Sequence, residues 1–366
     1  MDKELLAYAF LLQVGYTHKE LKDLLINNNT SLSAYELWKN TKDGIFPSLN
    51  VGRIEKIEEK IKKISEADIE ELLKNLSVEI ITQKDSRYPK NLCSIHHAPA
   101  FFYMRGKIAA QKRYIGVVGS RKHTHYAKET LIKILPQIIQ SGIGIVSGGA
   151  TGVDTLGHEI CIDEGGDTLV VLGTGIDICY PSRNRELFEK VVSSGSAIIS
   201  HFPLGIGPEP YNFPIRNELV AAISIGIIIP EAGLSSGTLI TAQLALEHGR
   251  DVFAIPGDIF RTTSEGTNML IASGQAKCVR CSGDILEEYF EVKNIGSGMS
   301  PIVKAPPVFS NDIEKQIYEA IMNGFTSIDE LLGETGLDTI LLLSHTSLLE
   351  VQGHIKLDEM GRYRVN

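Results

Sequence analysis

Short apolar runs alternate with amphipathic segments through the middle of the chain. The runs contain four or five residues each and fall at 114–118, 143–146, 168–172, 197–200, 225–229 and 251–255. The segments between them, such as 154–164 and 238–248, repeat apolar residues at helical spacing. Strand and helix in strict alternation predict an α/β fold with a mostly parallel sheet covered by helices on both faces.

The segments before and after this region have different patterns. Residues 1–75 repeat apolar residues at helical spacing and predict a small helical domain of the SAM or helix-hairpin-helix kind. Residues 292–310 are rich in Gly, Ser and Pro and predict a linker. Residues 311–366 predict three helices and a hairpin, the order found in a winged helix. The predicted central domain is therefore 76–291.

Charge is distributed unevenly along the chain. The net charge of −9 argues against a broad nucleic-acid surface. However, residues 111–125 carry Lys112, Arg113, Arg121 and Lys122 and no acid. Residues 300–366 hold five Lys or Arg against ten Asp or Glu, which favours a protein contact over a DNA contact for the winged helix.

The composition predicts a cytoplasmic protein without a membrane span. The chain is 43% hydrophobic and 22% charged, and it has neither a long apolar segment nor a secretory signal at its start. Five scattered cysteines favour reduced thiols. Cys278 and Cys281 form one C-x-x-C pair; zinc is the alternative, but no second ligand pair lies nearby in the sequence. We expect no bound metal and no cofactor.

Four glycine-rich turns each follow an apolar run. They are Gly119-Ser120-Arg121, 147–152, Gly173-Thr174-Gly175 and Ser235-Ser236-Gly237-Thr238. Small residues between a strand and a helix leave backbone N–H groups and the helix dipole open to an anion. Right-handed crossovers bring these turns to one edge of the sheet, so this edge is predicted to bind phosphate. The turns match neither the dinucleotide fingerprint nor a P-loop, which disfavours NAD and ATP.

Other polar residues allow two interpretations. The stretch 212–217 places Phe213, Arg216 and Asn217 in one turn, as stacking on a strand of bases requires, although Phe213 could belong to the core and Arg216 could pair with Glu218. Asp154 and His158 lie four residues apart; a structural pair is favoured over a metal site, as it is for His96-His97 and Ser200-His201. The sequence contains no recognisable catalytic nucleophile with a base.

Taken together, these motifs resemble the DprA/Smf family of DNA-processing proteins. The resemblance extends over nearly the whole chain and is strongest from 114 to 275. The matching segments are Tyr114 to Arg121, Ser147 to His158, Gly173 to Leu187 with its Asp177-x-x-Tyr180-Pro181-x-x-Asn184-x-x-Leu187 signature, Phe213 to Asn217, Glu231 to Ala242, Arg250 to Gly257 and Ser264 to Ile271.

The resemblance implies a Rossmann-like core that binds single-stranded DNA without sequence preference. It also implies a homodimer that helps to place the RecA recombinase on incoming strands during natural transformation, and it implies no catalysis. Carried over by motif, the phosphate site consists of Gly119, Ser120, Arg121, Ser147, Gly148, Gly149, Arg216 and Asn217, with Ser236, Gly237 and Thr238 nearby. Phe213 would stack on bases, and Lys122, Arg183 and Arg185 would extend the positive edge.

Two positions depart from the family pattern. Glu218 follows the Arg-Asn pair where the family commonly has another arginine, and Ser182 stands where many relatives have a lysine, with Arg183 next. Both departures affect basic contacts to phosphate.

Two other functions compete with strand binding. An enzyme resembling the Lonely guy phosphoribohydrolases would need a glutamate in its glycine turn, and Thr241 occupies that place. A scaffold that docks partners through its terminal domains is compatible with strand binding.

Overall fold

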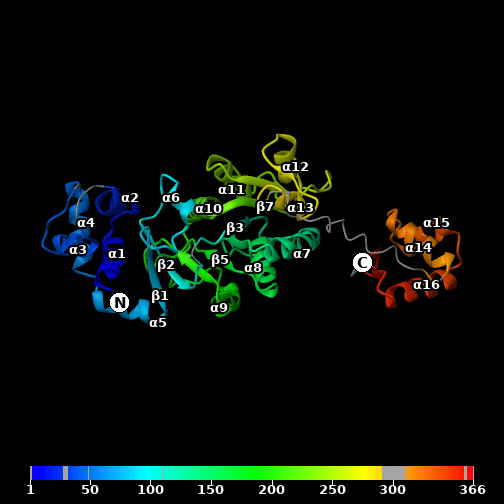
Figure 1. Cartoon of the computed structure of the whole chain (residues 1–366), viewed down its shortest axis with the longest axis horizontal. Helices are drawn as coiled ribbons and strands as arrows, with labels where there is room; N and C mark the ends of the chain where they lie inside the picture. The colour runs from blue at the N-terminus through cyan, green and yellow to red at the C-terminus, as the bar shows by residue number, and fades with distance from the viewer. Residues whose placement is uncertain are drawn as a thin grey trace. The chain divides into compact units, whose positions relative to one another are not determined.

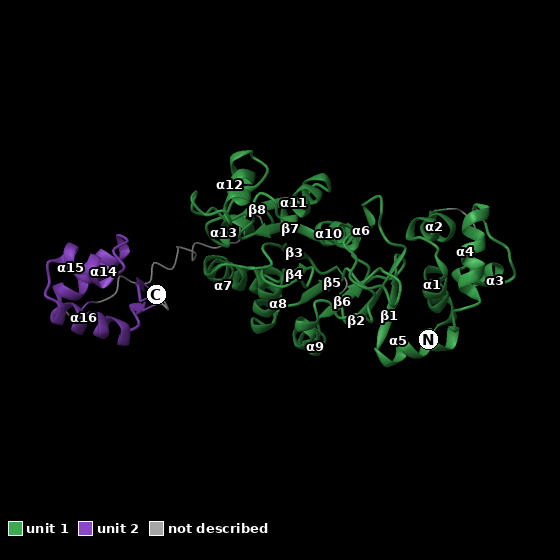
Figure 2. Ribbon diagram, turned by 180° about the vertical axis from the view of Figure 1, so that it is seen from behind, with its two compact units in different colours: residues 1–290 green, residues 291–366 purple. Residues whose placement is uncertain are grey.

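The computed structural model describes residues 2–27, 32–47, 49–109, 111–290, 309, 311–357 and 361–365. The chain divides into two compact units, Met1–Phe290 and Glu291–Asn366, which are coloured separately in Figure 2. The predicted linker, 292–310, lies outside the described residues except for Phe309. No helix in the described part of the chain is long and apolar enough to cross a membrane.

The first unit is built around one large sheet (Figure 1). Its strands are β1 (Val78–Thr82), β2 (Phe101–Gly106), β3 (Tyr114–Val117), β4 (Gly144–Ser147), β5 (Thr168–Val171), β6 (Ala197–Ser200), β7 (Ser224–Ile229), β8 (Asp251–Ala254) and β9 (Lys277–Cys278). Their spatial order is β1-β2-β6-β5-β4-β3-β7-β8-β9. Strands β3 to β9 are parallel, and β2 pairs antiparallel with both β1 and β6.

Helices cover both faces of this sheet, so the predicted fold class is confirmed. One face is packed by α7 (His125–Gln140), α8 (Val153–Asp163), α9 (Arg185–Ser193) and α13 (Gly283–Leu286). The other is packed by α6 (Lys90–Cys93), α10 (Asn212–Ile223), α11 (Gly237–Glu247) and α12 (Glu265–Ala272). The strands are apolar on both faces because both are buried, which is why they appear in the sequence as continuous apolar runs.

The N-terminal helices share one hydrophobic core with the sheet. They are α1 (Lys3–Val14), α2 (His18–Lys22), a π-helical turn at Asp23–Asn27, α3 (Ala34–Lys42), α4 (Val51–Ile61) and α5 (Glu66–Asn75). Tyr8 on α1 packs against Phe101 on β2, with ring centroids 5.4 Å apart. The Gln13 amide donates to the carbonyl of Leu204, 3.1 Å away. Residues 1–75 are thus packed against the central sheet rather than standing apart from it.

His18 is a second polar connection between these helices and the sheet. Its Nε2 lies 2.6 Å from the carbonyl oxygen of His201, while its Nδ1 is buried without a hydrogen-bond partner among the described residues. Burial lowers the pKa of His18 to about 4. The ring is therefore neutral in the folded chain at neutral pH.

Acidification is expected to destabilise the fold through His18. The unfolded chain binds a proton at an ordinary histidine pKa of about 6.5, so the free energy of unfolding should fall as the pH drops from about 6.5 towards 4. The expected loss is about 1 kcal/mol at pH 5.5 and about 2 to 3 kcal/mol at pH 4.5. Urea unfolding of the His18→Gln variant should show a smaller loss than the wild type. His125→Gln, at an exposed histidine, is the control; equal pH profiles for His18→Gln and wild type would contradict the assignment.

The second unit contains α14 (Asp312–Met322), α15 (Ile328–Thr335) and α16 (Thr339–Val351), followed by the strands β10 (Ile355–Leu357) and β11 (Tyr363–Val365). The two strands pair antiparallel. A separate core includes Ile317, Leu331, Leu342, Leu349 and Tyr363. Most of the predicted hairpin turn, 358–360, lies outside the described residues, and the assignment as a winged-helix domain stays a prediction.

Candidate phosphate-binding site

The strand order places the candidate site between β3 and β7. From β3 the chain builds the sheet outward in one direction through β4, β5 and β6, and then returns to add β7, β8 and β9 on the other side. At such a switch point the loops that leave adjacent strands diverge and open a crevice at the carboxyl edge of the sheet. The turns after β3, β4 and β7 all meet at this edge.

The turn after β3 holds Arg121 and Lys122 towards solvent. The Ser120 hydroxyl donates to the carbonyl of Lys122 and accepts from its N–H, which closes a tight turn. Thr124 caps α7, and its N–H and hydroxyl donate to the buried carboxylate of Glu231 at 3.1 and 2.7 Å. The base of the turn is therefore anchored while the two cationic side chains remain exposed.

Buried hydrogen bonds fix the turn after β4. The Ser147 hydroxyl donates to the carbonyl of Val117 at 2.7 Å and ties the ends of β4 and β3 together. The Asn184 amide donates to the carbonyl of Gly149 and to the hydroxyl of Thr155, both at 2.9 Å. Gly149 has φ +66°, and a Cβ there would meet Val170 and Phe188 in the core. Ser147 and Gly149 thus shape the turn rather than face a ligand.

Two neighbouring cavities open at this edge. The first has a volume of about 230 Å³ and the second about 310 Å³. The first is lined by Val118, Gly119, Arg121, Gly148, Ala150, Asp154, Phe213, Arg216, Asn217, Val220, Ser236, Gly237, Thr238 and Thr241. The second is lined by Arg121, Lys122, Gly148, Ala150, Thr151, Gly173, Tyr180, Pro181, Arg183, Phe213 and Arg216.

Phe213 and Arg121 belong to both cavities. The guanidinium of Arg121 lies 5.7 Å from the centroid of the Phe213 ring, and the guanidinium of Arg216 lies 5.9 Å from it. The Tyr180 ring is 5.8 Å from that of Phe213. Two guanidinium groups and a second aromatic ring are thereby gathered around Phe213, a combination that suits a chain of bases and phosphates.

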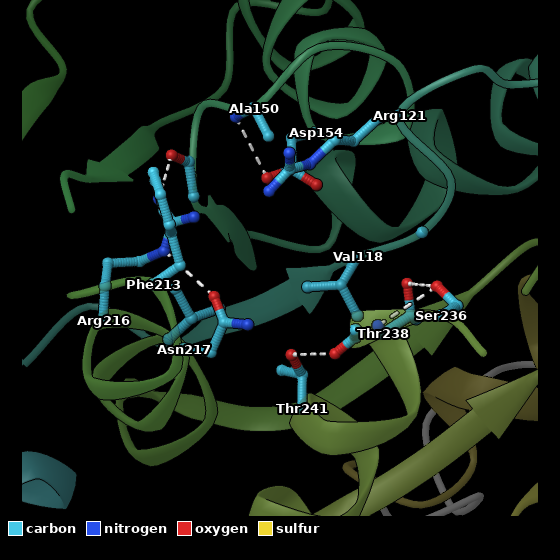
Figure 3. A pocket seen from close by; sticks show the side chains of 14 residues that line it. Val118, Arg121, Ala150, Asp154, Phe213, Arg216, Asn217, Ser236, Thr238 and Thr241 are labelled. Atoms are coloured by element: carbon cyan, nitrogen blue, oxygen red, sulfur yellow. Dashed lines mark hydrogen bonds between the residues drawn. The ribbon is translucent and has the colours of Figure 1, made fainter. Parts of the chain in front are cut away.

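Figure 3 shows how the walls of the first cavity are divided. Phe213, Arg216 and Asn217 come from the start of α10, and Ser236, Thr238 and Thr241 come from the start of α11. The Ser236 hydroxyl accepts from the Thr238 N–H and caps α11. The cavity therefore combines a cationic, aromatic wall with a neutral wall of hydroxyl groups.

Arg216 is a buried cation with part of its hydrogen-bonding capacity unused. Its Nη1 donates to the carbonyls of Gly148 and Val171, the latter at 2.8 Å, and its Nε donates to the Asn217 amide oxygen at 3.0 Å. Its Nη2 has no hydrogen-bond partner among the described residues. Burial lowers the pKa of Arg216 while nearby Asp154 raises it. A phosphate at Nη2 would complete the set of acceptors around this guanidinium.

Asp154 is the carboxylate that lines the first cavity. Burial raises its pKa, and Arg216 opposes this shift. Its oxygen accepts the Ala150 N–H at 3.2 Å. His158 bonds instead to the Thr168 hydroxyl at 2.7 Å, and burial lowers its pKa to about 3. Both side chains therefore have structural roles, but they bond to separate partners and do not form the pair expected from the sequence. Among the described residues, no group of three His, Cys, Asp or Glu could hold a metal ion.

Most of the predicted site residues come together at these cavities. Those that line at least one are Gly119, Arg121, Lys122, Gly148, Arg183, Phe213, Arg216, Asn217, Ser236, Gly237 and Thr238. Ser120, Ser147, Gly149 and Arg185 line neither. Arg185 is the exposed first residue of α9, beyond the turn that presents Arg183.

The structure also shows where the two departures from the family pattern lie. The Glu218 carboxylate lies 3.5 Å from His248 and lines neither cavity, so it does not pair with Arg216. Ser182 begins a short 3-10 helix (Ser182–Asn184) that carries Arg183 to the wall of the second cavity.

Sequence reasoning missed several lining residues. They are Val118, Asp154, Tyr180, Pro181, Val220 and Thr241. Ala150, Thr151 and Gly173 also line the cavities, and they lie in glycine-rich turns that the sequence indicated for phosphate. Tyr180 and Pro181 were visible as part of a motif, and an aromatic residue beside a glycine turn was the available signal. Val220 and Thr241 lie within α10 and α11, where only the packing of the two helices reveals which face meets the cavity.

The fold and the cavities define an α/β protein with a polar, largely cationic candidate site at the switch point of its sheet. The family model of DNA recombination-mediator protein A matches residues 79–290, more than half of the chain. The chain belongs to this family. DNA processing protein DprA from Streptococcus pneumoniae is 37% identical over 206 residues, which are 56% of this chain and 72% of that protein.

Two solved structures are similar over long stretches. The structure of DprA from Streptococcus pneumoniae has a TM-score of 0.63 and 30% identity, and covers 79% of this chain and 99% of that one. A structure of DNA processing protein A from Helicobacter pylori has a TM-score of 0.52 and 27% identity, and covers 58% of this chain and 98% of that one. The latter is described as giving insight into a unique single-stranded DNA binding mode of that protein.

Proposed function

We propose that the chain binds single-stranded DNA without sequence preference along the two cavities. The observation that carries this proposal is the position of Phe213, which lies between Arg121, Arg216 and Tyr180 at the boundary of both cavities. Successive bases stack on the rings, while the guanidinium groups neutralise the phosphates between them. The Helicobacter pylori relative, whose single-stranded DNA binding mode has been described, supports this proposal.

The polar contacts fit the sugar-phosphate backbone rather than base edges. Arg121, Lys122 and Arg183 are exposed cations. Opposite them, α11 begins at Gly237 and Thr238, where the positive end of the helix dipole meets the Gly237 N–H, which has no hydrogen-bond partner among the described residues. Charged groups and backbone N–H groups read phosphate, which is the same in every sequence. Binding is therefore expected to tolerate any base order.

A comparison of strands across a salt series tests the proposal. Single-stranded dT should bind more tightly than a duplex of equal length, because a duplex cannot offer unstacked bases to Phe213. Three or four neutralised phosphates predict a slope of about −2 to −3 in log affinity against log salt. Fluorescence anisotropy measures both quantities. Equal affinity for the two forms, or a flat salt profile, would contradict the proposal.

The proposal extends to recombination in the cytoplasm. A homodimer would hold incoming strands during natural transformation and help to place RecA on them, in keeping with the mediator family to which the chain belongs. The second unit would contact protein rather than DNA. Its helix α16 contains no Lys or Arg, and Ile340 and Val351 on it are 82% and 87% exposed.

Removal of residues 300–366 should separate these roles. The shortened chain retains both cavities, so its affinity for single-stranded dT should stay within about threefold of the full chain. RecA filament assembly on a bound strand should decrease if the second unit docks the recombinase. The rate of ATP hydrolysis by RecA measures this assembly. A large loss of dT affinity would instead assign the second unit to DNA. Sedimentation velocity on both chains tests the homodimer, and a purely monomeric species would contradict it.

Nucleotide hydrolysis is the competing function, and it would depend on Asp154. The Lonely guy proteins need a glutamate where Thr241 stands, and Thr241 lines the cavity without a carboxyl group. Asp154 is hydrogen-bonded to Ala150 and close to Arg216, so it holds the turn and balances charge. We therefore propose a non-catalytic role. Release of free base from a nucleoside monophosphate would overturn it.

A further inference from the structure

A third cavity lies at the opposite edge of the sheet from the candidate site. It has a volume of about 260 Å³, and we call it the amino-edge cavity. Tyr114, the first residue of β3, lines it, whereas Val118, just past the end of β3, lines the first cavity. β3 has four residues at about 3.3 Å each, so roughly 13 Å of strand separates the two sites.

The amino-edge cavity has an apolar floor and a cationic rim. Its floor includes Ile108, Tyr114 and Ile223, which are 5%, 3% and 3% exposed. Its rim carries the basic side chains Arg87, Lys90, Lys112 and Arg113 and the amides Asn91 and Gln111. The described residues that line it include no carboxylate.

Ion pairs leave two of the four cations for a ligand. Arg87 is held by Glu79 at 2.7 Å and Asp85 at 2.8 Å, and Lys112 by Asp167 at 2.5 Å. Lys90 and Arg113 have no ion pair among the described residues.

Arg113 is oriented by stacking rather than by an acid. Its guanidinium lies over the rings of Tyr289 and Phe290, 5.3 and 5.5 Å from their centroids. Stacking positions this group without consuming its N–H donors. Arg113 can therefore still donate to a ligand.

Hydrogen bonds from Arg250 hold in place the wall of the amino-edge cavity that α6 and α10 form. Arg250 Nη2 donates to the carbonyls of Asn91 and Ala222 at 3.4 and 3.3 Å, which fastens α6 against the end of α10. The two helices lie side by side in Figure 1. Gln111, which also lines the cavity, adopts φ +62°, an unfavourable conformation for a residue with a side chain. Strained residues of this kind are concentrated at ligand sites.

We propose that the amino-edge cavity binds one nucleotide. The base lies on the floor beside Tyr114, and Asn91 and Gln111 supply both donors and acceptors to its edge. The phosphate is held by Lys90 and Arg113. A carboxylate ligand would need donors alone and would leave the apolar floor and the amide oxygens unused. The volume, slightly below the usual range for small-ligand sites, limits the occupant to one base.

The nucleotide can come from a DNA strand or from solution, and binding assays distinguish the two. Anisotropy with dT6 and dT30, and calorimetry with dTMP and ATP, are performed on the full chain and on the Lys90→Glu and Lys90→Glu/Arg113→Gln variants. If a strand is the source, dT30 binding should weaken about tenfold, and its salt slope should become shallower by about 0.7 for each lost contact. If a free nucleotide is the source, dTMP or ATP binding should weaken at least fivefold while dT30 binding is unchanged.

The control is Lys133→Glu/Lys190→Gln, which makes the same charge change at two exposed lysines outside every cavity described above. The inference is overturned if the variants at the amino-edge cavity shift no ligand more than this control does. Because Arg113 stacks on two rings, its replacement can loosen the fold. Lys90→Glu, at an exposed residue without an ion pair among the described residues, therefore serves as the deciding variant.

Discussion

Replacement of Arg121 by alanine is expected to lower the affinity for single-stranded dT by about ten- to a hundredfold. Arg121 faces both cavities and stacks on Phe213, so its loss removes a phosphate contact and one side of the stacking wall. A hydrogen bond to a charged group contributes about 1.5 to 3 kcal/mol. The salt slope should become shallower by about 0.7 because one fewer counterion is released. Anisotropy titrations at several salt concentrations measure both effects.

Arg183 and Arg185 provide a matched comparison. Both are exposed arginines two positions apart, but Arg183 lines the second cavity and Arg185 lines neither. We expect Arg183→Ala to lower affinity about tenfold, whereas Arg185→Ala should change it less than threefold. If Arg185→Ala weakens binding as much as Arg121→Ala, the strand follows a path outside the two cavities.

Local sequence was sufficient to predict the sheet because its strands are buried on both faces. An apolar run such as 168–172 has few alternatives to a central strand, and β5 occupies 168–171. The antiparallel pair β1 and β2 was harder to predict. Phe101, Phe102, Tyr103 and Met104 are all fully buried, so β2 shows no alternation, and nothing local to these residues reveals that β2 runs against the others.

The site was predictable where function depends on neighbours in sequence. The glycine turns and their cations follow strands directly, so their meeting at the carboxyl edge followed from topology. The roles of Gly149 and Arg216 depend instead on distant residues. Gly149 faces Phe188 across the core, and Arg216 is fixed by the carbonyls of Gly148 and Val171. No local pattern specifies such a buried cation or the cavity left beside it.

This buried arrangement makes Gly148→Ala the second substitution with a large expected effect. A Cβ at position 148 would overlap Cζ and Nη1 of the Arg216 guanidinium, closer than atoms can approach. Arg216 is 5% exposed and cannot move aside without losing its bonds to Gly148 and Val171. We expect the free energy of unfolding to fall by about 2 to 4 kcal/mol. Affinity for dT should fall more than in Arg121→Ala, because Arg216 and the adjoining Phe213 are both displaced.

Two other glycines separate this mechanism from simpler ones. A Cβ on Gly237, across the first cavity, would meet no described residue within 4 Å, so Gly237→Ala adds a methyl group without moving Arg216. Gly52 on α4 is distant in sequence from the site, and a Cβ there would also meet no described residue within 4 Å. Alanine at position 52 should stabilise the helix by up to about 1 kcal/mol. Urea unfolding and dT titration of the three variants should single out Gly148→Ala in both measurements. If Gly237→Ala lowers the affinity for dT as much as Gly148→Ala does, and neither variant changes the free energy of unfolding, the loss reflects a filled cavity. Displacement of Arg216 is then not its cause.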